Sequence, residues 1–295
     1  DKIIIFLGGS TVEQQYIPDE KTSAGLMQQF LRNNQKDYEV INTGVSGLRG
    51  YHNLILMNYL NNIIPEEKEI IYINLIGFND WSYSLKAFLD NPDRSSNPLI
   101  SGSPLNIKNL LHPQFFLLTN IFRSIRNNFV TYQNQTLTYD FDQQHKDVFS
   151  TYNEKPKVSF NNDKYEKMTV WYSEILEKLI SKCEDRNKTR CIFLDQPVSW
   201  HEGDFNDLDF TEKLWMTPSY SKAAMSPDSL IRVSNEFNLK LKQKVSECSS
   251  QKCHFIAASE IIRSPKNFYD DAHFTNFGAN KIYDILKNYF LIEFF

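Results

Sequence analysis

The sequence predicts an α/β protein: a three-layer α/β/α sandwich around a mostly parallel, five-stranded sheet. Short apolar runs such as "IIIFLG" and "EIIYINLI" alternate with helical patterns along the chain. Strands that are apolar on both faces are typical of a parallel sheet covered by helices. The 295 residues, 41% of them hydrophobic, can bury a full core, and no linker is evident. We therefore expect a single domain over residues 1–295.

The first half of the chain predicts a βαβαβ unit. Strands are expected at residues 2–7, 38–43 and 69–76, where β-branched and aromatic residues gather. Helices near residues 22–34 and 51–62 separate them.

The alternation resumes in the second half. Trp171, Ile175 and Leu179 recur at i, i+4 and i+8, which predicts a helix. Ser226 is the expected N-cap of another helix, with Pro227 in its first turn. The elements expected here, in order, are a helix near 164–182, a strand at 190–195, the helix after Ser226, a strand at 253–258 and a helix at about 275–291.

Two stretches interrupt the pattern, at about residues 86–163 and 196–226. They are irregular, and the first is rich in Asn, Ser, Pro and aromatic residues. We interpret both as insertions that run over the carboxyl ends of the strands, where ligands bind in such sheets.

Charge and hydropathy exclude several partners. The net charge is −4, the isoelectric point is near 5.9, and no basic run is present, so we expect no nucleic-acid partner. No apolar stretch approaches the roughly 20 residues of a transmembrane helix. The chain begins at Asp1 and enters a strand at once, so we expect a longer precursor whose export signal or anchor is absent.

The four cysteines fall in two close pairs, Cys183 with Cys191 and Cys248 with Cys253. Each pair joins the end of a predicted helix to the start of a predicted strand. Free thiols or a zinc site are alternatives, but the spacings contain no C-x₂-C pair. We predict two local disulfides, which would indicate a periplasmic, cell-surface or secreted protein.

Polar residues follow the predicted strands. The first strand runs into two glycines and Ser10, which is compatible with a phosphate-binding turn, a nucleophile turn or a tight connection. The later blocks "NTGVSG" and "GFND" follow the second and third strands. Parallel strands end at one edge of a sheet, so Ser10, Gly47 and Asn79 should meet at one rim.

These blocks, with "DDAHFTNFG" before the last helix, resemble in order the four blocks of the SGNH hydrolase family, the GDSL-type esterases and lipases. The resemblance covers residues 3–280 and implies a flavodoxin-like fold. It also implies that Ser10 is the nucleophile, His273 the base, Asp270 the residue orienting the base, and that Ser10, Gly47 and Asn79 form the oxyanion hole. It implies no cofactor and no metal.

Two details of the resemblance stay open. Gly9 stands where the GDSL motif has Asp, and Gly44 is near enough to Gly47 to be the alternative donor. Taken singly, each motif residue also has a structural explanation as a turn or cap residue.

The residue chemistry agrees with the resemblance. A serine hydroxyl needs a neutral imidazole to take its proton, and the imidazole needs a carboxylate to fix its tautomer. We therefore expect a serine esterase that hydrolyses an O-acyl ester through an acyl-enzyme, with acetyl groups on a small molecule or glycan as candidate substrates. An O-acyltransferase with the same triad and a non-catalytic glycan-binding module are the alternatives. Trp81 and His201 are tentative substrate-binding residues at the rim.

Overall fold

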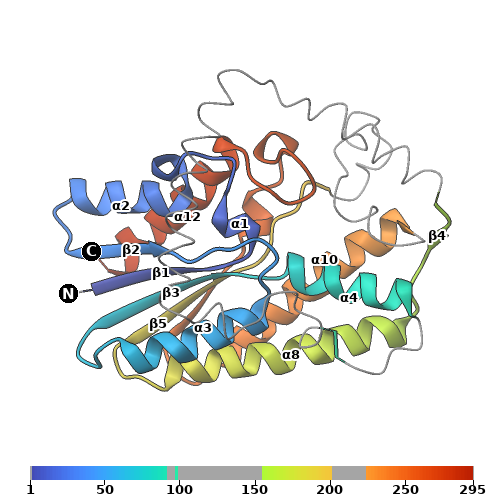
Figure 1. The fold of residues 1–295 in the computed structure, drawn as a ribbon, viewed down its shortest axis with the longest axis horizontal. Helices are drawn as coiled ribbons and strands as arrows, with labels where there is room; N and C mark the ends of the chain where they lie inside the picture. The colour runs from blue at the N-terminus through green and yellow to red at the C-terminus, as the bar shows by residue number, and fades with distance from the viewer. Residues whose placement is uncertain (1, 92–96, 99–154, 201–223, 295) are drawn as a thin grey trace.

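The computed structural model describes residues 2–91, 97–98, 155–200 and 224–294 (Figure 1). Its main sheet has five strands in the order β2-β1-β3-β5-β7, and all of them pair in parallel. This confirms the predicted α/β class and all five predicted strands. The strands are β1 (Lys2–Gly8), β2 (Tyr38–Asn42), β3 (Glu69–Leu75), β5 (Thr189–Leu194) and β7 (Cys253–Ile256).

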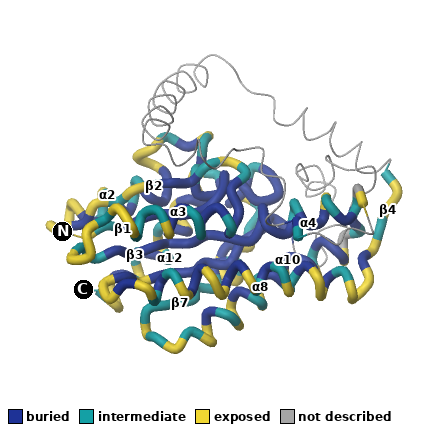
Figure 2. The backbone as a smooth tube through the Cα atoms, turned by 60° about the horizontal axis from the view of Figure 1, so that its bottom comes forward, coloured by how far each residue is buried: buried dark blue, intermediate teal, exposed yellow. Residues whose placement is uncertain are grey.

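Helices cover both faces of this sheet, as Figures 1 and 2 show. On one face lie α2 and α12, and on the other lie α3, α8 and α10, so the sheet is the buried middle layer. The longer helices are α2 (Ser23–Asn33), α3 (Gly50–Ile63), α4 (Phe78–Asp90), α8 (Asn162–Glu184), α10 (Pro227–Ser246) and α12 (Asn276–Glu293). The short ones are α1 (Ser10–Glu13), η1 (Asp19–Lys21), α11 (Ala258–Ile261) and η3 (Pro265–Asn267).

Strand β1 shows why its sequence is apolar throughout. Ile4 and Phe6 pack in the cluster that includes α2 and α12, whereas Ile5 and Leu7 pack in the cluster of α3, α8 and α10. Successive side chains of a strand point to opposite faces, and here both faces are covered.

The helix starts follow local chemistry. The hydroxyl of Ser226 accepts a hydrogen bond from the Ser229 N–H at 3.4 Å, which is the predicted N-cap of α10. Helix α4 was not predicted. It begins directly after Gly77, whose φ of +136° suits glycine, and its first turn holds Asn79 and Asp80, residues that resemble a loop in sequence.

Helix α4 continues to Asp90, so the first irregular stretch starts later than the expected residue 86. Near the end of the first irregular stretch lies β4 (Lys157–Val158), which pairs in parallel with β6 (Ala224–Met225) near the end of the second stretch. Most of both predicted insertions lies outside the described residues.

The disulfide prediction is half right. Cys183 and Cys191 form a disulfide that joins α8 to β5, but Cys248 and Cys253 are free thiols. Cys248 Sγ lies 3.6 Å from the Glu184 carboxylate and 3.4 Å from the Ser250 carbonyl oxygen, and its single S–H can donate to one of them at a time. The Cys248 thiol thus faces oxygen acceptors and is not bonded to Cys253.

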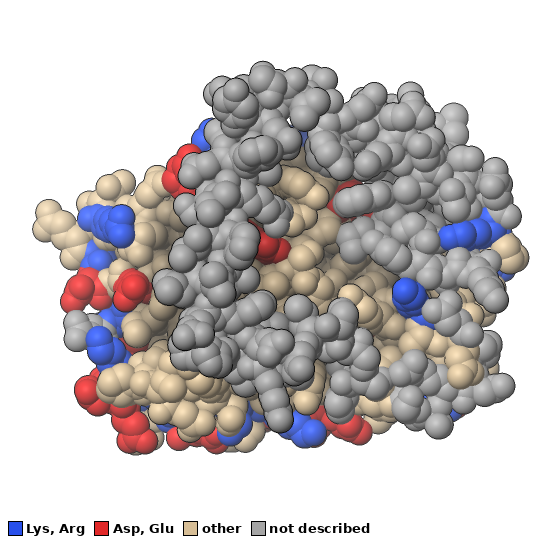
Figure 3. Space-filling view, viewed as in Figure 1, with Lys and Arg blue, Asp and Glu red and all other residues tan. Residues whose placement is uncertain are grey.

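On the visible described surface, acidic and basic side chains are interspersed (Figure 3). Within the described ranges, no helix is long and apolar enough to cross a membrane.

Candidate active site

Two consecutive glycines bring Ser10 to the carboxyl edge of the sheet. A Cβ at Gly8 would lie 2.6 Å from the Leu75 carbonyl oxygen, and a Cβ at Gly9 would collide with Asn79 Nδ2. Glycine therefore allows β1 and the nucleophile turn to press against β3 and α4. At Gly9, where the GDSL motif has Asp, the Asn79 side chain lies against the position that a Cβ would take.

Ser10, His273 and Asp270 form a continuous chain of hydrogen bonds. His273 Nε2 lies 2.6 Å from Ser10 Oγ, and His273 Nδ1 lies 2.6 Å from Asp270 Oδ2. Asp270 Oδ1 accepts backbone N–H groups from Ala272 at 2.9 Å and from His273 at 2.8 Å. Asp270 is fully buried, and Ser10 and His273 are 4% and 6% exposed. The loop before α12 thus holds the imidazole between a carboxylate and a hydroxyl.

The pKa of His273 in the folded chain is higher than that of an imidazole in water. Burial lowers the pKa of His273, but the charge and hydrogen bond of Asp270, with the charges of Asp271 and Glu13, outweigh it and raise the pKa above its ordinary value. A base of this kind gains its proton readily and becomes neutral only when the pH exceeds its raised pKa.

Asn79 lies in the first turn of α4, directly after β3, and Gly47 lies on the loop that follows β2. Asn79 Nδ2 donates one hydrogen to the Leu48 carbonyl at 2.8 Å, and an amide nitrogen carries two. Gly47 adopts φ +82°, a left-handed conformation that favours glycine.

Gly44 has a different role in the same loop. Its N–H donates to Asn42 Oδ1 at 2.9 Å, and the position of a Cβ would be filled by the backbone of Val12 and Glu13. Gly44 therefore shapes the turn, and Gly47 is the better candidate for an oxyanion donor.

Asp80 is a buried residue of the site that the sequence interpretation missed. Its Oδ1 accepts the Gly50 N–H at 2.9 Å and so joins the start of α3 to the start of α4. Burial raises the pKa of Asp80 to about 6, although the Gly50 N–H and the nearby Arg49 charge oppose this change. Its place in "GFND", next to Asn79, was the available signal.

Two tyrosines, also missed, border His273. The Tyr269 ring stacks on the His273 ring with centroids 5.4 Å apart and planes 7° apart. Tyr16 packs edge-on against Tyr269 at 5.3 Å and is 38% exposed. An aromatic surface therefore lies beside the imidazole.

The tentative role of Trp81 is wrong. Trp81 is 1% exposed and packs against Phe78 at 4.7 Å and Trp200 at 5.9 Å. The turn of α4 that brings Asn79 to the rim directs Trp81 into the core. The other tentative binding residue, His201, lies outside the described residues.

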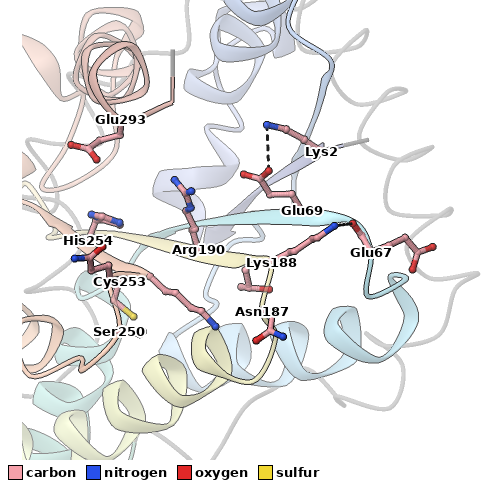
Figure 4. A pocket seen from close by; sticks show the side chains of 13 residues that line it. Lys2, Glu67, Glu69, Asn187, Lys188, Arg190, Ser250, Cys253, His254 and Glu293 are labelled. Atoms are coloured by element: carbon pink, nitrogen blue, oxygen red, sulfur yellow. Dashed lines mark hydrogen bonds and ion pairs between the residues drawn. The ribbon is translucent and has the colours of Figure 1, made fainter.

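A pocket of about 1000 Å³ lies at the amino ends of the strands, at the end of the sheet opposite Ser10 (Figure 4). It is lined by Lys2, Glu69, Thr189 and Cys253, the first residues of four strands. Two of its charges pair with each other, Lys2 with Glu69 at 3.3 Å, and Lys188 Nζ donates to the Glu67 carbonyl at 3.1 Å. It takes no part in the site around Ser10, which lies where the strands end.

The site has the mutual geometry of a Ser-His-Asp triad, set on the carboxyl rim of a parallel α/β sheet. No family model matches the chain, and no curated protein matches it.

Solved structures do match it. LAE5, an α/β hydrolase enzyme from the metagenome of Lake Arreo, Spain, aligns with a TM-score of 0.52 and 10% identity over 97% of this chain and 93% of LAE5. A member of the lipolytic protein G-D-S-L family from Veillonella parvula aligns with a TM-score of 0.49 and 10% identity, over 99% of this chain and 100% of that protein. A carbohydrate acetylesterase family member from Sinorhizobium meliloti aligns with a TM-score of 0.47 and 10% identity, over 98% of this chain and 97% of that protein. The likeness to LAE5 shows a shared fold, in agreement with the flavodoxin-like fold expected for this chain.

Proposed function

We propose that this chain is a serine esterase of the SGNH type that hydrolyses an O-acyl ester through an acyl-enzyme. The observation that carries the proposal is the hydrogen-bonded chain from Asp270 through His273 to Ser10, with 2.6 Å at both steps from the imidazole. Gly47, on the loop after β2, and Asn79, in the first turn of α4 after β3, follow the two strands that flank β1.

Each group has one task in this reaction. Ser10 Oγ attacks the carbonyl carbon while its proton passes to His273 Nε2, and Asp270 stabilises the imidazolium that forms. The carbonyl oxygen becomes negative, and the N–H groups of Ser10 and Gly47 and the Asn79 amide donate to it.

The intermediate then collapses. The bond to the leaving alkoxide breaks, the alkoxide takes the proton from His273, and the acyl group stays on Ser10. Water attacks the acyl-enzyme as His273 accepts its proton, and that proton returns to Ser10 when the acid is released.

The test is fluorophosphonate labelling of the intact chain, mapped by mass spectrometry, beside turnover of p-nitrophenyl acetate. We expect an adduct on Ser10, and we expect Ser10→Ala to lose both adduct and turnover. A folded wild-type chain with neither adduct nor turnover would contradict the esterase and favour the glycan-binding alternative.

We further propose that the acyl group is carried by a sugar. Support comes from the tyrosine pair, since the partly exposed Tyr16 ring packs against Tyr269, whose ring stacks on His273, and an exposed aromatic ring can stack on a sugar. Tyr16→Ala should raise KM for an O-acetylated oligosaccharide and leave p-nitrophenyl acetate turnover unchanged. Equal effects on both substrates would contradict the sugar site, and acetyl transfer to an added glycan would identify an acyltransferase.

The disulfide between Cys183 and Cys191 supports a second inference, that the chain works in an oxidising compartment outside the cytoplasm. Thiol alkylation of protein purified from its natural source tests this. Two alkylated cysteines before reduction and four afterwards are expected, whereas four before reduction would contradict it.

A further inference from the structure

Glu13 links the helix that carries Ser10 to the loop that carries Gly47. It is the last residue of α1, three positions after Ser10. Its Oε2 accepts the backbone N–H of Ser46 at 2.8 Å, and Ser46 directly precedes Gly47. The peptide beside the candidate oxyanion donor is therefore held by a side chain of the nucleophile helix.

The rest of the loop rests on the same short helix and on the strand before it. Asn42 Nδ2 donates to the Val12 carbonyl at 3.0 Å, and the Val45 N–H donates to the Gly8 carbonyl at 3.3 Å. These contacts hold the first part of the loop. The Glu13 carboxylate supplies the contact to Ser46, the residue before Gly47. Gly47 has no Cβ to restrict its backbone and adopts φ +82°.

We propose that Glu13 is a positioning residue that fastens the Gly47 loop to helix α1 and so fixes the distance between the nucleophile and the oxyanion donor. This inference rests on the proposed esterase function. Preorganised donors stabilise the transition state only if they do not have to move into place, so a loosened Gly47 would lower the rate of attack.

The carboxylate has a second, separable effect through its charge. The charged groups that act on His273 are Asp270 and Asp271 from its own loop and Glu13 from α1. All three raise the pKa of His273, Asp270 the most and Glu13 the least, so the hydrogen bond of Glu13 acts on geometry and its charge adds to the effect of Asp270 on the pH at which the base becomes neutral.

Two conservative variants separate these effects. Glu13→Gln keeps an oxygen that accepts the Ser46 N–H but removes the charge. Glu13→Asp keeps the charge but shortens the side chain by one methylene, so that it no longer reaches Ser46. Glu39→Gln is the control for loss of one negative charge. Glu39 is exposed and pairs with Ile3 near the amino ends of β2 and β1, away from the site.

Three readouts are measured on the full chain. The first is the rate of Ser10 phosphonylation by a fluorophosphonate between pH 5 and 9. The second is the NMR titration of the His273 imidazole, assigned with His273→Gln, and the third is hydrogen exchange of the Ser46 amide.

For Glu13→Gln we expect the wild-type plateau rate and wild-type Ser46 exchange, with both pH curves moved to lower pH, because one charge that raises the pKa of His273 is removed. For Glu13→Asp we expect nearly unchanged pH curves, faster Ser46 exchange and a plateau rate about 10-fold lower, as for one lost hydrogen bond. Glu39→Gln should match wild type.

A Glu13→Asp chain with wild-type plateau rate and wild-type Ser46 exchange would overturn the inference. Failure of the esterase proposal is recognised separately, as absence of a Ser10 adduct in the wild type at every pH. In that case the Ser46 exchange and the His273 titration still decide whether Glu13 holds the loop.

Discussion

Gly9 lies directly against the side-chain amide of Asn79, so that a Cβ on Gly9 would collide with Asn79 Nδ2. The second residue of the nucleophile turn and the candidate oxyanion side chain are therefore matched to each other, although 70 positions separate them.

This match predicts non-additive effects. Asn79→Ala should lower the turnover number for p-nitrophenyl acetate by about 10² to 10³, the usual effect of losing one oxyanion donor. Gly9→Ala should displace the Asn79 amide and cause a loss of similar kind. The double variant should lose less than the product of the two single losses, because removing the Asn79 amide relieves its collision with the added methyl and leaves only the close approach to the Leu48 carbonyl oxygen at 2.9 Å. A double variant whose losses multiply would show that the two positions act independently.

The pH dependence follows from His273. Because its pKa is raised, largely by Asp270 against the opposing effect of burial, the rate should rise with pH through a midpoint above the ordinary value near 6.5 and then level off. Initial rates with p-nitrophenyl acetate, corrected for spontaneous hydrolysis, give this curve. A flat profile from pH 5 to 9 would count against His273 as the base.

Asp80 should stabilise the fold through its acceptor oxygen and not through its negative charge. Asp80→Ala leaves the buried Gly50 N–H without its acceptor and should lower the free energy of unfolding by about 1–3 kcal/mol in urea titrations. Asp80→Asn retains an acceptor oxygen and should be much less destabilising. Equal losses in the two variants would show that the carboxylate charge is needed.

The same residue has a defined pH signature. The folded-state pKa of Asp80, about 6, lies above its unfolded value, so the folded chain binds this proton more tightly. Its favourable contribution is therefore complete below the unfolded pKa, near pH 3.8, and is lost as the pH rises through about 6. Asp80→Asn should remove that part of the pH dependence of unfolding.

Loss of the disulfide should destabilise the junction of α8 and β5. Cys183 and Cys191 are eight positions apart, and closing so short a loop reduces unfolded-chain entropy by an amount equivalent to roughly 2.5 kcal/mol. Replacing both by serine should lower the free energy of unfolding by at least this amount, because both sites are buried. A Cys248→Ser, Cys253→Ser chain is the matched control with the bridge intact. An equal loss in that control would contradict the assignment.

The sequence by itself determined the sheet and the positions of the main motifs. The apolar strand at residues 69–76 is a local pattern because both faces of the sheet are covered, and the i, i+4 spacing of the 164–182 helix is one because a single helix face is buried. Ser10, Gly47 and Asn79 could be assigned to one rim since parallel strands end at the same edge.

Only the tertiary structure decided which side chains meet. It placed Trp81 in the core, because the rotation of α4 that brings Asn79 to the rim turns Trp81 inward. It also brought Glu13 to Ser46 and Tyr269 onto His273. Such contacts join segments far apart in the chain or depend on the path of a loop, so they follow from how the helices and loops pack on the sheet and not from periodicity within any one segment.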